Sequence, residues 1–145
     1  MSFDHLVLDY NGTLACDGSL LPGIEAKLNV IANDLAVHII TADTFGKCRQ
    51  QCQDIKGEVI VLKNPVGAVE KQDFVHSLGS ERVVAIGNGT NDKLMLAQAA
   101  LGIAVMGSEG MSAEAMFNAD IIVSSIHDAL DLLINTDRLA ATLRQ

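Results

Sequence analysis

Short apolar runs alternate with longer amphipathic segments along the chain, and this alternation constrains the fold more than any other feature. Runs of this length are typical of strands, whereas the segments between them have the spacing of helices. Strands that are apolar at nearly every position are usually covered on both faces. We predict strands over 5–9, 36–40, 58–62, 82–86, 102–106 and 120–124, and helices over 23–34, 45–54, 67–78, 91–99, 111–117 and 126–143.

Right-handed helical crossovers between parallel strands produce a doubly wound sheet. The pattern therefore predicts an α/β fold with a mainly parallel sheet of about five to six strands and helices on both faces. Because no linker, repeat or low-complexity segment interrupts residues 1–145, we expect a single domain without a cap domain. A small hairpin is expected around Asp17 and Gly18, and Pro22 opens the helix that follows.

Charge and composition exclude several classes of partner. With 18 acidic and 10 basic residues, the formal net charge is -8, which repels nucleic acid and anionic lipid. Aromatic residues make up only 3% of the chain, so few rings are present to stack on nucleobases. No apolar run approaches the roughly 20 residues that cross a bilayer, and the first ten residues lack the pattern of a signal peptide. We expect a cytoplasmic protein that binds neither nucleic acid nor membrane.

Polar residues gather directly after the predicted strands. Asp9 ends the first strand and is followed by Asn11 and Gly12, an order that presents a carboxylate to a ligand. Asp and Asn are also ordinary turn residues, so this segment alone leaves both interpretations open. Thr41 follows the second strand, and residues 87–92 follow the fourth. Ligands of a doubly wound sheet bind beyond the carboxyl ends of its central strands, which predicts one site at that edge.

Four segments resemble the motifs of haloacid dehalogenase-like (HAD) phosphatases. DYNGTL, residues 9–14, resembles the D-x-D-G-T-L signature of that superfamily and the D-K-T-G-T-L of P-type ATPase phosphorylation domains. IITAD, residues 39–43, resembles its strand that ends in Thr or Ser, and Lys71 resembles its lysine. GNGTND, residues 87–92, resembles G-D-G-x-N-D. The closest match is the capless, soluble, P-type-ATPase-like branch of the superfamily.

The resemblance implies a phosphohydrolase or phosphotransferase that forms a phospho-aspartyl intermediate. Asp9 is the implied nucleophile, and Thr41 the implied hydrogen-bond donor to the phosphoryl oxygens. Lys71 would neutralise the charge of the aspartyl-phosphate, with Lys63 as the alternative lysine. The catalytic set that the resemblance implies is Asp9, Asn11, Thr41 and Lys71, and the phosphate-binding set is Gly12, Thr41, Ala42, Lys71 and Asn91.

The resemblance also implies a bound Mg²⁺, whose ligands would be Asp9, a backbone carbonyl at Asn11, Asn88 and Asp92. Two of these positions depart from the family's pattern. Asn11 stands where phosphatases of the family usually have an aspartate that moves protons, and an amide cannot do so. Asn88 stands where the motif has its first aspartate, so the metal site has one negative charge fewer.

Two functions fit these residues. The first is a magnesium-dependent phosphoric monoester hydrolase with slow turnover, which acts on a phosphorylated substrate of unidentified structure. The alternative is a catalytically impaired phosphate-binding or regulatory module of the same fold, in which Asn11 and Asn88 have ended turnover. The mean hydropathy of +0.29 is high for a small domain, so we also expect a homo-oligomer.

Overall fold

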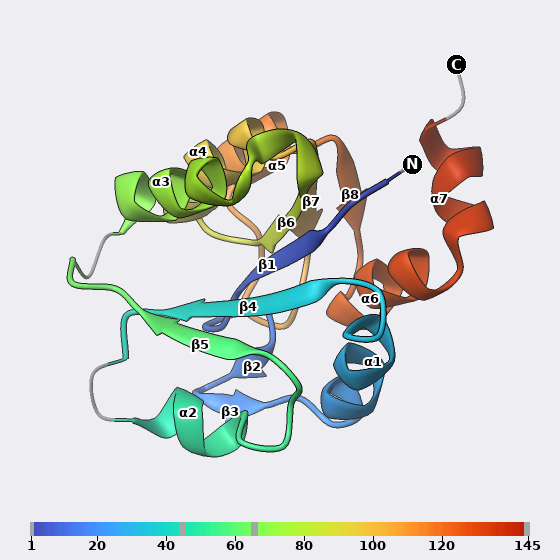
Figure 1. The fold of residues 1–145 in the computed structure, drawn as a ribbon. Helices are drawn as coiled ribbons and strands as arrows, with labels where there is room; N and C mark the ends of the chain where they lie inside the picture. Colours follow the sequence, from blue (N-terminus) through green and yellow to red (C-terminus); the bar gives the residue numbers. More distant parts are fainter. Residues whose placement is uncertain (1, 44–45, 65–66, 144–145) are drawn as a thin grey trace.

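The computed structural model describes residues 2–43, 46–64 and 67–143. These residues form a central parallel sheet that helices cover on both faces (Figure 1). The strand order is β5-β4-β1-β6-β7-β8, and every neighbouring pair is parallel. This order confirms the predicted doubly wound α/β fold. The strands are β1 (His5–Asp9), β4 (Ala36–Thr41), β5 (Glu58–Val61), β6 (Val83–Gly87), β7 (Leu101–Val105) and β8 (Ile121–Val123).

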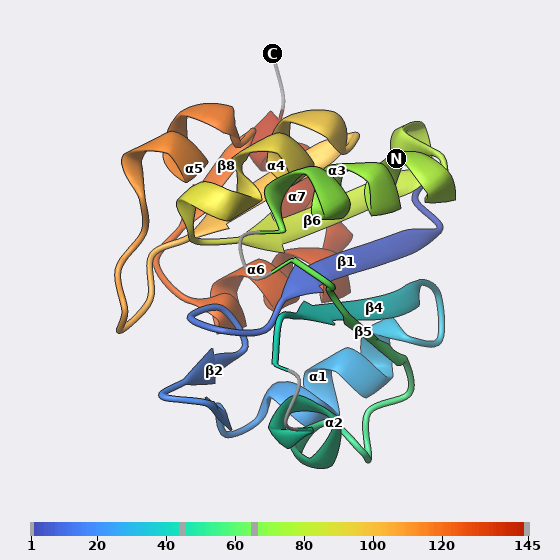
Figure 2. The same cartoon turned by 90° about the vertical axis from the view of Figure 1, so that its left-hand side faces the viewer.

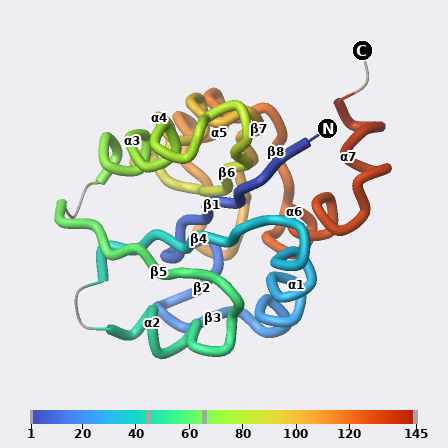
Figure 3. Tube along the Cα trace, in the orientation of Figure 1, coloured from blue at the N-terminus to red at the C-terminus, as the bar shows by residue number. Residues whose placement is uncertain are grey.

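The helices divide into two layers, which Figures 1 and 2 show above and below the sheet. The first layer is α3 (Ala68–Leu78), α4 (Lys93–Gln98) and α5 (Ala113–Asn118), and the second is α1 (Ile24–Ile31) and α6 (Ile126–Ile134). Strand residues alternate between these layers because successive side chains point to opposite faces. On β1, Leu6 and Leu8 pack into one buried cluster and Val7 packs into the other. The tube in Figure 3 follows the same path, with the C-terminal helix at one side.

β1 lies at the centre of the sheet, with β4 on one side and β6 on the other. The chain order of the strands reverses at this position, and ligands of doubly wound sheets bind at such switch points. Asp9 is the last residue of β1, so the topology places it at the predicted site.

The predicted hairpin forms from β2 (Ala15–Cys16) and β3 (Ser19–Leu20). Its turn residues, Asp17 and Gly18, both have positive φ, as the favoured two-residue hairpin turn requires. The hydroxyl of Tyr10 donates to the carbonyl of Gly18 at 2.9 Å, and the Tyr10 ring is buried. The hairpin is thereby attached to the core near the carboxyl ends of the strands. A short helix, α2 (Lys47–Gln51), lies beside β3.

Three of the predicted helices differ most from the structure in their bounds. The prediction of one helix over 126–143 is wrong, because Asn135 leaves the helical region and α7 (Thr136–Leu143) begins after it. Asparagine favours such breaks since its amide competes for backbone hydrogen bonds. The segment 91–99 divides into two elements, η2 (Thr90–Asp92) and α4, and a second 3₁₀ turn is η1 (Ser80–Arg82). The predicted helix over 45–54 shortens to α2, because Gly46 directly before it has a left-handed backbone conformation. Residue 45 lies outside the described residues.

In the part of the chain that the structure describes, every helix is too short or too polar to cross a membrane.

Candidate functional site

Asp9, Lys71 and Asp92 form a buried charge cluster at the carboxyl edge of the sheet. The Nζ of Lys71 donates to Oδ1 of Asp9 at 3.0 Å and to Oδ1 of Asp92 at 2.7 Å. The three residues are 7%, 2% and 0% exposed, respectively. A buried ammonium is costly unless it is paired, and here two carboxylates pair with it. The cluster therefore holds three charges from β1, α3 and η2 in one fixed arrangement.

The structure brings Lys71 to Asp9 and leaves Lys63 exposed on the surface. Lys71 lies in the first turns of α3, where its amide donates to the carbonyl of Gly67 at 2.9 Å. The loop that contains Lys63 is bonded to the start of α3, because the Lys63 amide donates to Oε2 of Glu70 at 3.2 Å, but the Lys63 side chain is exposed. Of the two lysines considered from the sequence, Lys71 is therefore the one positioned to contact a ligand bound at Asp9.

Burial of the cluster changes the proton affinity of its members. The pKa of Asp9 is raised from 3.8 to about 7, mainly by burial and also by the neighbouring charge of Asp92, against the opposing effect of Lys71. For Lys71, burial lowers the pKa, but the two carboxylates outweigh burial and the pKa is raised. Lys71 is thus charged at neutral pH, and Asp9 holds a proton more tightly than an exposed aspartate does.

Both carboxylate oxygens of Asp92 accept hydrogen bonds from groups of the protein. Its Oδ1 accepts from Lys71, and its Oδ2 accepts from the backbone amides of Asn88 and Gly89, both at 3.0 Å. Its carboxylate packs against Gly87, where an added Cβ would lie 2.5 Å from the carboxylate carbon. Asp92 is absent from the lining of the cavity described below. The carboxylate of Asp92 thus anchors Lys71 and the loop after β6, and its role as a metal ligand stays a prediction.

A cavity of about 180 Å³ opens beside Asp9. Its walls come from the ends of β1, β4, β5 and β6 and from α3, and most of the lining side chains are polar. Carboxylate and amide oxygens predominate, and these are the ligands that Mg²⁺ prefers, so the donor set fits this cation. The cavity is lined by Asp9, Asn11, Ala42, Leu62, Lys71, Asn88, Gly89 and Asn91.

Thr41 and Gly12 lie next to the cavity but outside its lining. The hydroxyl of Thr41 accepts a hydrogen bond from the amide of Asp43 at 3.0 Å. The amide of Gly12 donates to the carbonyl of Ala15 at 3.0 Å, so this N–H does not point to a ligand at Asp9. Gly12 has a φ of +77°, which favours glycine. The phosphate-binding roles of these two residues stay predictions.

Thr13 is a site residue that the sequence prediction missed. It is buried, and its Oγ1 lies 3.2 Å from Oδ1 of Asn88 and 3.5 Å from Oδ2 of Asp9. The hydroxyl therefore links two of the predicted metal ligands. Its place as the threonine of DYNGTL is the signal that would have identified it.

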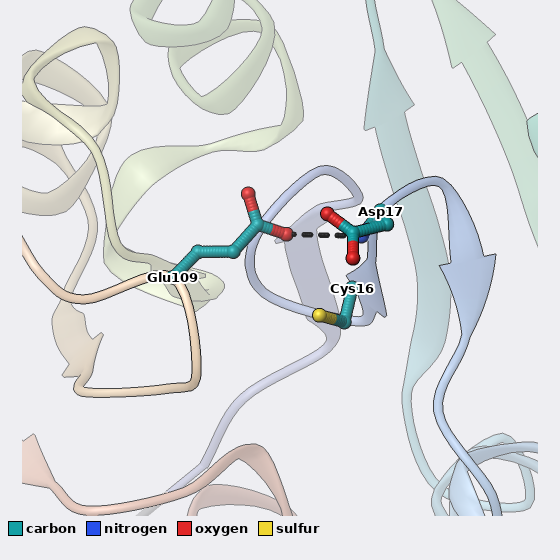
Figure 4. A group of neighbouring side chains, drawn as sticks. All are labelled: Cys16, Asp17 and Glu109. Atoms are coloured by element: carbon teal, nitrogen blue, oxygen red, sulfur yellow. Dashed lines mark hydrogen bonds between the residues drawn. The ribbon is translucent and has the colours of Figure 1, made fainter.

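A second group of ligand-type side chains lies between the hairpin and the loop after β7 (Figure 4). The ligand atoms of Cys16, Asp17 and Glu109 lie within 4.8 Å of one another. Both acids are exposed, and Oε2 of Glu109 already accepts a hydrogen bond from the Asp17 amide at 3.2 Å. Exposed acids are common without a metal, so we interpret this group as a contact between hairpin and loop.

Comparisons with known sequences identify relatives of the chain, although no family model matches it. The chain is 51% identical over 65 residues to the uncharacterized protein MJ0073 of Methanocaldococcus jannaschii, and the match covers 45% of this chain and 70% of that protein. It is 28% identical over 108 residues to the phospholipid-transporting ATPase tat-1 of Caenorhabditis elegans. That match covers 72% of this chain but only 9% of the ATPase.

Solved structures with a similar fold include phosphatases and proteins described as HAD hydrolases. The 3-deoxy-D-manno-octulosonate 8-phosphate phosphatase of Moraxella catarrhalis, in complex with magnesium, phosphate and KDO, has a TM-score of 0.76 at 15% identity, covering 98% of this chain and 94% of that one. The cobalt-bound phosphatase YrbI of Haemophilus influenzae has a TM-score of 0.77 at 13% identity, covering 99% and 94%. These similarities confirm the predicted HAD-like fold.

Proposed function

We propose that this chain, which belongs to the same family as MJ0073 and has the HAD-like fold, is a magnesium-dependent phosphoric monoester hydrolase with Asp9 as its nucleophile. The observation that carries the proposal is the buried contact of Asp9 with Lys71 beside a polar cavity at the switch point of the sheet. The magnesium and phosphate of the Moraxella phosphatase structure support the choice of cation and substrate class.

In the proposed reaction, the ionised carboxylate of Asp9 attacks phosphorus, and the bond between phosphorus and the ester oxygen breaks. The alcohol leaves with a proton from water. Water then attacks the aspartyl-phosphate, which releases inorganic phosphate and restores Asp9. Lys71 remains beside Asp9 throughout and neutralises the charge on the phosphoryl oxygens.

In this proposal, turnover is slow because an amide stands at position 11 in place of an acid. Asn11 lines the cavity, but its amide neither donates nor accepts a proton at neutral pH. General acid and base assistance is typically worth about 10²–10⁴-fold, so its absence makes both steps slow. The resemblance to P-type ATPases, whose motif also lacks an acid here, supports placing this chain near that branch, as does the match to tat-1.

We propose that Mg²⁺ is held by the Asp9 carboxylate, the backbone carbonyl of Asn11 and the amide oxygen of Asn88, with water completing its shell. When bound, the cation supplies charge neutralisation to the phosphoryl group. Asn91, on the same lining, is the proposed side-chain contact to phosphate. Asp92 takes the supporting role described above.

A second candidate is a phosphate-binding module without turnover. It is favoured by one observation, namely that the amides of Asn11 and Asn88 both line the cavity where the family's motif has acids. Binding of phosphate with Mg²⁺ is common to both candidates, so binding alone does not separate them.

Mass spectrometry after incubation with Mg²⁺ and acetyl phosphate or p-nitrophenyl phosphate separates the two candidates. We expect one added phosphoryl group on the peptide that contains Asp9, and slow release of phosphate. Asp9→Asn is the matched control, in which the modification and the release disappear. Equal hydrolysis by Asp9→Asn would contradict the enzyme proposal, and binding without any phosphorylation would favour the module.

A further inference from the structure

We propose that the backbone carbonyl of Gly110 is a positioning group of the cation site, because it turns the amide oxygen of Asn88 toward Asp9. The inference rests on the proposed function, since it concerns the cation that the cavity would hold. A side-chain amide has an oxygen end and a nitrogen end of nearly the same shape. Only the oxygen end ligates a cation, so a neutral ligand works only if its orientation is decided.

Contacts on both ends decide the orientation of Asn88. Its Nδ2 donates to the carbonyl of Gly110 at 3.2 Å, and its Oδ1 lies 3.2 Å from Oγ1 of Thr13. The Thr13 hydroxyl, 3.5 Å from Oδ2 of Asp9, marks the Asp9 side of the amide. A hydroxyl can donate or accept, so Thr13 alone would tolerate either end. The carbonyl of Gly110 can only accept a hydrogen bond, so it must face Nδ2. Gly110 is therefore the group that fixes the orientation of the amide.

The same contact explains why this chain has an amide at position 88. A carboxylate there would place an oxygen against the Gly110 carbonyl, and two acceptors without a proton between them repel each other. Either the loop or the side chain would have to move. The departure of Asn88 from the family's aspartate is therefore matched by the position of Gly110.

The Gly110 carbonyl is itself held in place. The Gly110 amide donates to the carbonyl of Gly107 at 2.9 Å, which closes the loop after β7. Gly110 has a φ of +84°, a conformation that glycine adopts without strain. Two residues further on, the amide of Ser112 donates to the backbone carbonyl of Asn88 at 2.8 Å. Asn88 is thus hydrogen-bonded to this loop at two points, through its side chain and through its backbone.

The outer side of this loop contacts the β2–β3 hairpin. The Ser108 hydroxyl donates to Sγ of Cys16 at 3.2 Å. Glu109 accepts from the Asp17 amide at 3.2 Å, as Figure 4 shows. The loop is therefore held between the cation site and the hairpin. A cation on the oxygen of Asn88 would polarise its amide and strengthen the bond from Nδ2 to Gly110. Cation binding should accordingly order residues 107–112.

The test measures two properties of the full chain, the Mg²⁺ dissociation constant by calorimetry and the amide hydrogen exchange of residues 107–112 with and without Mg²⁺. In the unsubstituted protein we expect Mg²⁺ to slow exchange in this loop. Asn88→Ala should raise the dissociation constant about tenfold and make loop exchange insensitive to Mg²⁺. An unchanged dissociation constant in Asn88→Ala would overturn the role of Asn88 as a ligand.

Asn88→Asp is the isosteric variant that isolates the Gly110 contact. It should bind Mg²⁺ at least as tightly, because it adds a negative charge, yet its loop should exchange faster than in the unsubstituted protein. Protection of residues 107–112 equal to that of the unsubstituted protein would overturn the positioning role of Gly110.

NMR of the unsubstituted protein covers the case in which these variants fail to fold. We expect the Nδ2 protons of Asn88 to exchange with water more slowly than those of the exposed Asn135, and to shift on addition of Mg²⁺. Equally fast exchange at both positions would overturn the inference. Asp9→Asn distinguishes failure of this inference from failure of the proposed function. If Asp9→Asn binds Mg²⁺ as tightly as the unsubstituted protein, the proposed function fails. If Asp9→Asn loses Mg²⁺ while the Asn88 variants match the unsubstituted protein in Mg²⁺ binding and loop exchange, only the inference fails.

Discussion

Asp9 is held in an environment that favours ligand binding over stability. Its carboxyl is buried beside Asp92, and the ammonium of Lys71 compensates for its charge. A bound cation would favour the ionised form, as would the approach of phosphorus to the nucleophile. Functional sites commonly retain such destabilising groups. In the absence of metal, this arrangement should lower the free energy of unfolding by a measurable amount.

We expect Asp9→Asn to stabilise the metal-free protein, and the gain to grow with pH. The pKa of Asp9 is raised from 3.8 to about 7 on folding, so the folded state binds more protons than the unfolded state between these values. The stability of the unsubstituted protein therefore falls as pH rises through this window, whereas the variant lacks this dependence. Urea unfolding in EDTA at pH 5 and pH 8 should show the difference widening by about 2–3 kcal/mol. A constant difference would contradict the burial argument.

Asn11→Asp should accelerate turnover, because it supplies the group that moves a proton to and from water. We expect a gain of about 10²-fold or more in phosphate release, and less trapped phospho-Asp9. Asn11→Ala is the control, which should remain as slow as the unsubstituted protein. If the aspartate variant folds and binds Mg²⁺ but gains no hydrolysis, proton transfer at this position does not limit the reaction.

At the scale of elements, the site is assembled where a strand end, a helix start and two loops meet. α3 contributes Lys71 from its first turns, and η2 contributes Asp92, while β1 ends in Asp9. The β2–β3 hairpin borders the same edge and is attached to the core by Tyr10. Ala15 of the hairpin is also buried and the Leu20 amide donates to Gln51, so the order of the hairpin should depend in part on the Tyr10 bond.

Tyr10→Phe tests this dependence, since it keeps the buried ring and removes only the hydroxyl that donates to Gly18. We expect the free energy of unfolding to fall by about 1 kcal/mol and exchange of hairpin amides to increase. Amides of the central strands β1 and β6 serve as the internal control and should lose protection only in proportion to global stability. Unchanged hairpin exchange would show that other contacts hold it.

At the scale of the whole molecule, one end of the sheet leaves apolar side chains in contact with solvent. Phe117 at the end of α5 is 79% exposed, and Ile122 in the edge strand β8 is 49% exposed. Edge strands in native proteins are normally covered or protected. These exposures support the expected homo-oligomer.

Sedimentation of the unsubstituted protein at micromolar concentration should therefore show a dimer or a larger species. Phe117→Ser should shift the distribution toward monomer, because it removes the largest exposed apolar side chain at this end. Val30→Ser, on α1 at the other face and 51% exposed in the folded chain, is the control and should leave the distribution unchanged. A monomer in the unsubstituted protein would contradict self-association.

The sequence by itself determined the fold and the location of the site. Alternating apolar runs specified the strands, the handedness of crossovers restricted their order, and polar residues at strand ends indicated the ligand-binding edge. Asp9 and Lys71 were predictable because one lies at a strand end and both belong to segments that resemble known motifs. Each of these features involves residues that lie close together in the chain, so the sequence predicts them directly.

Only the tertiary structure decided which polar atoms remain available to a ligand. It showed that Lys71 and two amides donate to the oxygens of Asp92, and that the amide of Gly12 donates to a neighbouring carbonyl. It also placed Thr13 between Asp9 and Asn88 and brought Gly110 to the amide of Asn88. Hydrogen bonds depend on distances within a few tenths of an ångström between segments far apart in the chain, and no spacing of residues along a sequence encodes those distances.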